Sequence, residues 1–83
     1  MSGYRVQFAP LADEARRALP RPSRVLFDSE MSATLGRDPY GHGSCPVGKE
    51  RDRREATVAG AFVVYYVSRT VMVVTAVKIV ARP

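Results

Sequence analysis

The sequence predicts an α+β domain in which two N-terminal helices pack on one face of a mostly antiparallel four-stranded sheet. Three observations carry this prediction. A short segment of alternating polarity lies at Tyr4–Phe8, two segments of helical periodicity follow it, and the region from Val58 to Val80 is rich in β-branched and aromatic residues. The order strand, helix, helix, strand, strand, strand is typical of helices layered on an antiparallel sheet.

The first strand and the first helix are predicted from the spacing of their apolar residues, which alternate in the strand and follow a helical repeat in the helix. In Tyr4–Phe8 the apolar side chains fall on one face of an extended chain, and Arg5 and Gln7 fall on the other. Pro10 ends this strand and suits the first turn of a helix, which we expect over Leu11–Leu19. The apolar stripe expected for this helix comprises Leu11, Ala15, Ala18 and Leu19.

The second helix is expected over Ser23–Leu35, after the helix-breaking segment Pro20–Pro22. Its apolar residues repeat every four positions, and Gly36 can supply a left-handed residue at its end. The two helices form a hairpin whose apolar faces need a sheet to cover them. The side chains expected to be buried are Phe8, Leu19, Phe27, Met31 and Leu35.

Three further strands are expected at Arg53–Ala59, Ala61–Val67 and Val71–Val77, with Ser68–Thr70 separating the last two. These runs are apolar at nearly every position instead of alternating. One face therefore packs on the helices, and the other is expected to contact a partner protein or a second copy in a homodimer.

Composition limits the class of protein. The chain has 83 residues, so we expect a single domain spanning residues 1–83. With 46% hydrophobic and 25% charged residues, the composition is that of a folded domain and argues against disorder. The net charge of +5 favours an acidic partner such as a nucleic acid.

Targeting signals and metal ligands are not expected. The apolar stretch Val58–Ala81 is split by Ser68–Thr70 into halves of about ten residues, and a helix that spans a bilayer needs about twenty. Met1–Pro10 contains no secretory signal, and the single cysteine, Cys45, fits a reducing compartment. The sequence therefore predicts a cytoplasmic protein without membrane contact. Since the chain has one cysteine and one histidine, we also expect no metal and no cofactor.

The run Lys49–Glu55 contains seven consecutive charged residues with a net charge of +1. A solvated strand edge is one interpretation. The other is a binding surface, because in an extended chain Lys49, Arg51 and Arg53 would project from one face at a spacing of about 6.6 Å, which suits the successive phosphates of a single strand. The pattern alone leaves both interpretations open.

The remaining candidates for chemistry are weaker. His42 lies between two glycines without a motif that would place a catalytic partner beside it, so a loop histidine is the favoured interpretation. Cys45 is favoured as a passive thiol. Tyr65 and Tyr66 are consecutive in a predicted strand and face opposite sides, so one belongs to the core and the other can stack on a base or fill an interface.

The segments "YRVQFAPLADEARRALP", "LGRDPYGHG" and "VAGAFVVYYVSRTVMVVTAV", in this order, resemble the RelE/ParE superfamily of small bacterial toxins over nearly the whole chain. This resemblance implies the α+β fold described above and one of two activities. RelE-like members cut mRNA in the ribosomal A site with cationic and tyrosine side chains, and ParE-like members inhibit DNA gyrase. Both kinds are bound by an antitoxin protein encoded beside them.

The resemblance also implies a set of site residues. Arg53 matches a basic position of the ribonuclease-type members, and Glu55 stands where the next cation is expected. The arginine expected just after the glycine-aromatic step is absent, because the sequence there is Gly60-Ala61-Phe62-Val63. The C-terminal tyrosine or histidine of such members has no counterpart before Pro83. The residues expected to stabilise charge in catalysis are Arg51, Arg53 and Arg54, and those expected to contact RNA are Lys49, Lys78 and Arg82.

The function expected from this resemblance is that of a type II toxin, a ribosome-dependent mRNA endonuclease that inhibits translation. Its expected partners are a cognate antitoxin, the ribosome and mRNA. The chemistry would be metal-independent, with a 2′-hydroxyl attacking its own phosphate while arginines neutralise the developing charge. The alternative is a non-catalytic binding protein, either a gyrase inhibitor or a degenerate homologue that binds only its antitoxin.

Overall fold

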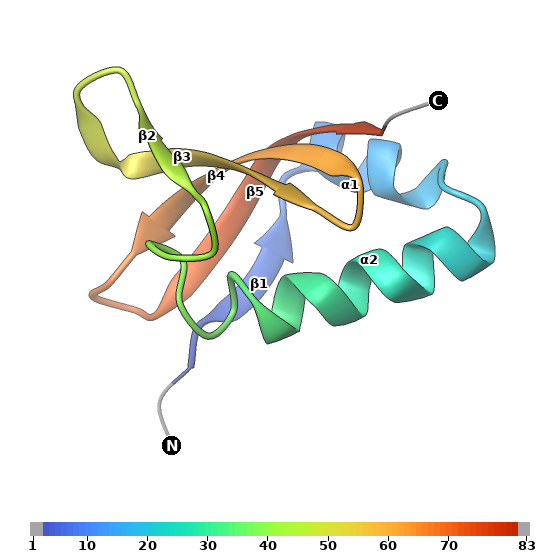
Figure 1. The fold of residues 1–83 in the computed structure, drawn as a ribbon, viewed down its shortest axis with the longest axis horizontal. Coiled ribbons are helices and arrows are strands. Elements are labelled where there is room, and N and C mark those ends of the chain that lie inside the picture. Colours follow the sequence, from blue (N-terminus) through green and yellow to red (C-terminus); the bar gives the residue numbers. More distant parts are fainter. Residues whose placement is uncertain (1–2, 82–83) are drawn as a thin grey trace.

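The computed structural model describes residues 3–81, which form two helices and five strands (Figure 1). The strands assemble into one sheet in the order β1-β5-β4-β3-β2. In chain order the elements are β1 (Arg5–Phe8), α1 (Pro10–Arg17), α2 (Arg21–Ala33), β2 (Cys45–Val47), β3 (Glu50–Val58), β4 (Ala61–Ser68) and β5 (Val73–Ala81).

The predicted fold class is confirmed, with one strand more than expected. β2 pairs antiparallel with β3, and β3 begins at Glu50 rather than Arg53, so the charged run is itself part of the sheet. β3, β4 and β5 are antiparallel neighbours, whereas β1 pairs with β5 in parallel. The turn between β3 and β4 consists of Ala59 and Gly60, whose φ angles of 48° and 81° match the primed hairpin turns that suit the twist of a sheet.

The predicted stripe of the first helix is wrong at Leu11 and at Ala18, both of which are exposed. Leu11 is 77% exposed, and Ala12 is fully buried against the sheet. α1 packs mainly on β5, so its buried face carries the small side chain of Ala12 with Ala15 and Leu19 beside it. Successive residues of a helix are about 100° apart, and Leu11 therefore points away from the sheet.

The core lies between the helices and one face of the sheet. Phe27, Met31 and Leu35 are buried as predicted, and Phe8 and Leu19 are partly buried against them. Buried residues of β3, β4 and β5 complete the core, namely Ala56, Val58, Ala61, Val63, Tyr65, Val67, Val74, Ala76 and Ile79.

Gly36 does not adopt the left-handed conformation predicted for it. Positive φ angles among the glycines occur at Gly43, Gly48 and Gly60. Gly36 is required for another reason, because a Cβ atom at this position would lie 2.7 Å from the carbonyl oxygen of Ser32. The close approach lets the chain turn from α2 towards β1, where the Tyr4 amide donates to the Gly36 carbonyl over 2.6 Å.

The helix hairpin is joined by an ion-pair network around Arg16. Its guanidinium contacts the Asp13 carboxylate at 2.9 Å and the Asp28 carboxylate of α2 at 2.8 Å. It also lies 5.0 Å from the centre of the Phe8 ring. Arg16 therefore links both helices and β1. No helix within residues 3–81 is long and apolar enough to cross a membrane.

Candidate nucleic-acid interface

Among residues 3–81, no helix or further strand covers the face of the sheet opposite the helices (Figure 1). We call it the open face and define it by the residues that alternate with the core positions of each strand. These are Arg5 and Gln7 of β1, Val73, Thr75, Lys78 and Val80 of β5, Phe62, Val64, Tyr66 and Ser68 of β4, and Arg53, Glu55 and Thr57 of β3.

Arg53 and Tyr66 are paired across β3 and β4 at the polar end of the open face. The Arg53 guanidinium lies 5.7 Å from the centre of the Tyr66 ring, which is 42% exposed. Both side chains line a shallow pocket of about 310 Å³ together with Glu50, Arg51 and Asp52. The Arg53 Nε atom is buried without a hydrogen-bond partner among the described residues. An aromatic face beside a cation is the combination that stacks bases and contacts phosphates.

The row of Arg53 and Tyr66 continues across the sheet to Thr75 and Gln7. The Gln7 amide donates a hydrogen bond of 2.9 Å to the Thr75 hydroxyl. This row therefore offers polar groups on four adjacent strands.

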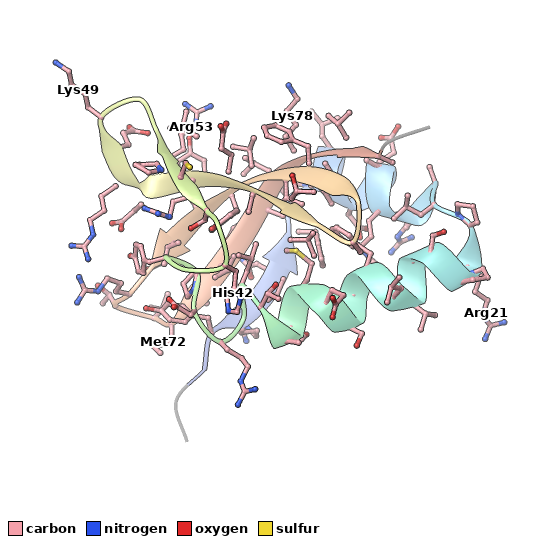
Figure 2. All side chains as sticks on the ribbon, viewed as in Figure 1. Arg21, His42, Lys49, Arg53, Met72 and Lys78 are labelled. Carbon is pink, nitrogen blue, oxygen red and sulfur yellow. The ribbon has the colours of Figure 1, made fainter. Side chains whose placement is uncertain are left out.

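Lys78 lies in the next row of the open face. Its strand partner is Val64, whose partner on the other side is Glu55. β4 and β5 shift register between Val64 and Tyr65, which leaves Val77 without a partner. Figure 2 shows Arg53 and Lys78 pointing away from α2 on the same side of the sheet, whereas Arg21 and His42 lie on the other side.

Arg54 lies elsewhere than the sequence predicted. It is 7% exposed and points to the helix side of the sheet, in line with the buried residues Ala56 and Val58. Its guanidinium donates to the Ser44 hydroxyl at 3.0 Å and to the carbonyls of Arg51, Ser44 and Tyr40 at 3.0, 3.2 and 3.4 Å. These bonds occupy most of its donors, so in this conformation Arg54 fixes the loop to β3 and is not available to a phosphate on the open face.

Arg51 does not share a row with Lys49 and Arg53. β2 and β3 shift register between Pro46 and Val47, whose partners are Arg54 and Glu50. The residues between those partners twist out of the regular pleat. The Arg51 guanidinium lies 5.1 Å from the centre of the Tyr40 ring, and Lys49 lies in the β2–β3 turn.

Tyr40 is the centre of a cluster formed by Tyr40, Ser44, Arg51, Asp52 and Arg54, which we call the Tyr40 cluster. The ring lies close to two guanidinium groups, and the hydroxyl donates to the Asp52 carboxylate over 2.6 Å. Burial raises the pKa of Tyr40 to about 12, and the hydrogen bond to Asp52 adds to this rise. The neighbouring Tyr65 is fully buried and donates to the Pro39 carbonyl over 2.5 Å, and burial also raises its pKa. The cluster therefore fastens the loop 38–44 to the sheet.

His42 does not add to the open face, and Cys45 lies at its edge as the strand partner of Glu55. His42 has a φ angle of 55° and lines a pocket of about 220 Å³ between the loop, α2 and the edge of β3. Cys45 is a free, exposed thiol on β2. Within residues 3–81 no group of three or more histidine, cysteine or carboxylate side chains could hold a metal ion. Arg82, which the resemblance assigned to RNA contact, lies outside the described residues.

This chain matches known proteins by its structure and not by its sequence. No family model and no curated protein matches the sequence. A chain of the RelBE2 toxin–antitoxin complex of Mycobacterium tuberculosis gives a TM-score of 0.79 at 19% identity, covering 98% of this chain and 100% of that one. The isolated E. coli RelE toxin gives 0.74 at 19% identity, covering 96% and 86%. A chain of the archaeal RelE–RelB complex from Pyrococcus horikoshii OT3 gives 0.67 at 20% identity, covering 95% and 94%.

This chain has the RelE fold. The resemblance seen in the sequence is thus confirmed at the level of the fold. In this RelE fold, Arg53 and Lys78 reach the open face, whereas Arg54 belongs to the Tyr40 cluster. Sequence reasoning missed this role of Arg54, although a signal was present. Counting back by twos from the core residues Val58 and Ala56 reaches Arg54, so the period of the strand placed it on the buried face.

Proposed function

We propose that this chain is the toxin of a type II toxin–antitoxin pair, acting in the cytoplasm as a ribosome-dependent mRNA endonuclease that inhibits translation. The observation that carries the proposal is the RelE fold with a cationic, aromatic open face. Single-stranded RNA would lie across this face, with a base beside Tyr66 and phosphates at Arg53 and Lys78. The net charge of +5 supports an anionic ligand.

The proposed cleavage needs no metal. The 2′-hydroxyl of one nucleotide attacks the adjacent phosphorus, and the 5′-oxygen of the next nucleotide leaves. Negative charge grows on the phosphate oxygens in the transition state, where fixed cations stabilise it more than they stabilise the ground state. Arg53 and Lys78 have this role, Lys49 and Arg51 contact the RNA at the sheet edge, and Arg54 positions the strand that carries Arg53.

The proposed partner that restrains the toxin is an antitoxin. Two neighbouring apolar side chains on the open face, Phe62 and Val80, are 37% and 47% exposed and are strand partners. They lie at the opposite end of β4 from Tyr66. A partner that covers them, whether the antitoxin or a second copy in a homodimer, would bury apolar area and approach the RNA surface at the same time.

A second function, binding without cleavage, is favoured by two departures from the family pattern. Glu55 stands where the resemblance implies a cation, and the arginine expected just after the glycine-aromatic step is absent. A gyrase inhibitor or a homologue that only binds its antitoxin would not need cations there. A protein with this second function would leave cellular transcripts uncut.

Inducible expression followed by primer-extension mapping of transcripts distinguishes these functions. The endonuclease arrests growth and produces new 5′ ends inside translated messages, and these ends disappear when translation of the message is blocked. The double variant Arg53→Ala/Lys78→Ala should abolish both effects, whereas Arg21→Ala/Arg37→Ala, which removes the same charge elsewhere, should keep them. Growth arrest without new ends, together with inhibited supercoiling by purified gyrase, would support the second function.

A further inference from the structure

We propose that Glu55 and Lys78 are the general base and general acid of the cleavage, acting from opposite sides of a phosphate seated over Val64. This inference rests on the proposed endonuclease function and assigns the proton transfers within it. It explains why the open face of this chain can carry a carboxylate at a position where the resemblance implies a cation.

The placement follows from the register of three adjacent strands. Glu55 of β3 pairs with Val64 of β4, and Val64 pairs with Lys78 of β5. Paired residues of antiparallel strands point to the same face, so all three side chains project from the open face. Neighbouring strands are about 4.8 Å apart, which places the Cα atoms of Glu55 and Lys78 about 10 Å from each other. Val64 is 8% exposed and forms a low apolar floor between the two longer side chains.

The surroundings leave both groups available. The ion pairs closer than 4 Å among residues 3–81 involve Asp13, Arg16, Arg17 and Asp28, and neither Glu55 nor Lys78 takes part in one. Glu55 is partly buried and Lys78 is exposed. Among the residues that define the open face, Glu55 is the one carboxylate, while Glu50 and Asp52 line the pocket beside Arg53 and Tyr66. The histidine of the chain lies on the other side of the sheet.

The cations around Glu55 favour binding of an anionic ligand, although the Glu55 carboxylate is itself negative. Arg53 is two residues before Glu55 on the same face, Lys78 lies across β4, and Tyr66 is the diagonal neighbour. Cys45 of β2 is the strand partner of Glu55 on its outer side. Two cations and one carboxylate thus surround the proposed phosphate position, so a net positive charge remains when Glu55 is ionised.

The proton balance closes without an added reactant. Glu55 removes the proton of the 2′-hydroxyl as its oxygen bonds to phosphorus, and Arg53 neutralises charge on the non-bridging oxygens. The bond from phosphorus to the 5′-oxygen breaks, and the Lys78 ammonium gives a proton to this leaving oxygen. The products are a 2′,3′-cyclic phosphate and a 5′-hydroxyl, and solvent returns the two side chains to their starting protonation states.

The test measures single-turnover cleavage of a defined mRNA bound to ribosomes, with purified wild-type protein and single variants. Glu55→Gln keeps the shape of the side chain and removes the base, so we expect a fall in rate of about 100-fold or more. Glu55→Asp should recover part of the rate. The matched control is Glu14→Gln, the same change at an exposed position of α1 on the covered side of the sheet, which should leave the rate unchanged.

Lys78 is tested with an RNA whose 5′-bridging oxygen at the cleaved bond is replaced by sulfur, because a thiolate leaves without a proton. Lys78→Met should slow cleavage of the oxygen substrate about 100-fold and of the sulfur substrate about threefold or less. Glu55→Gln should slow both substrates alike. Binding is measured with a 2′-deoxy substitution at the cleaved position, and thermal melting shows that each variant is folded.

Each outcome decides between the two proposals. Cleavage by Glu55→Gln at the wild-type rate would overturn the base assignment and leave the endonuclease function standing. Equal losses on the two substrates for Lys78→Met would make Lys78 a phosphate contact and overturn the acid assignment. If the wild-type protein binds ribosomes and mRNA but releases no cyclic phosphate, the endonuclease function fails and the acid–base pair fails with it.

Discussion

The helix-covered face and the open face are formed by the same strands, and alternating residues point to each. On the covered face β4 contributes Ala61, Val63, Tyr65 and Val67, all nearly inaccessible to solvent. On the open face the same strand contributes Phe62 and Tyr66, which are 37% and 42% exposed. The comparison indicates that the covered face contributes most of the buried apolar area that stabilises the fold. Residues on the open face can therefore serve ligand binding at little cost in stability.

The largest expected effect contrasts two phenylalanines. Phe27→Ala removes a ring that is 1% exposed in the core, and we expect it to lower the free energy of unfolding by about 3–5 kcal/mol. Phe62→Ala removes a ring that is 37% exposed on the open face, and about 1 kcal/mol is expected. Thermal melting measures both, at about 4–8 °C per kcal/mol for a domain of this size. Similar losses for the two variants would contradict the contrast between the faces.

The next effect contrasts neighbouring arginines. Arg54→Met leaves the carbonyls of Arg51, Tyr40 and Ser44 without this donor, and we expect a loss of about 3 kcal/mol in stability. Arg53→Met removes one stacking contact with Tyr66 and should cost less than about 1 kcal/mol. Urea titration measures both values. If Arg54 were the ligand-binding residue and Arg53 the structural one, Arg53→Met would lose more stability than Arg54→Met.

A smaller effect concerns salt. Arg53→Ala/Lys78→Ala should weaken the binding of single-stranded RNA and reduce the slope of log K against log salt by about 0.7 for each lost phosphate contact. The control is Arg21→Ala/Arg37→Ala, two exposed arginines of the same charge. Arg16 is unsuitable as a control because it links both helices to β1. Equal slopes for the two double variants would mean that the net charge acts diffusely and that the open face has no local site.

The smallest effect is a pH dependence from the Tyr40 cluster. The pKa of Tyr40 is raised to about 12 in the folded protein, above the usual value of 10.0, so the folded state holds this proton more tightly than the unfolded state. The stability that this contributes is complete below pH 10 and is lost as the pH rises towards 12. Chemical denaturation at a series of pH values should show a shallower decline in Tyr40→Phe. A decline of unchanged steepness would assign the alkaline loss to other groups.

Most of the fold was predictable from hydrophobic periodicity. Both helices and the three long strands lie within a few residues of their predicted positions because each has an apolar face of the expected period. β2 was missed because Cys45–Val47 is short, contains Pro46 and reads as loop. The second valine-rich strand begins at Val73 rather than Val71, which is 65% exposed in the turn. The parallel pairing of β1 with β5 was also missed, because no local pattern encodes the neighbours of a strand.

The candidate site was predictable in composition and less so in geometry. The sequence indicated a cationic strand, and Arg53 does reach the open face beside Tyr66. It did not indicate that Arg54 is buried, since residue type alone favours exposure of arginine. It also did not indicate that Glu55 and Lys78 flank Val64, because that placement depends on the pairing register of three strands.

The pairing of β1 with β5 has a consequence for how the protein is made. Gln7 and Thr75 form a hydrogen bond across a sequence separation of 68 residues, and β5 lies between β1 and β4 in the sheet and pairs with both. During synthesis the two helices leave the ribosome well before the strands on which they pack. Contacts of such long range form slowly, because the intervening loop must close first. A nascent chain therefore has neither its core nor its open face until β5 has emerged. Until then, the ribosome that synthesises the protein is not exposed to an assembled open face.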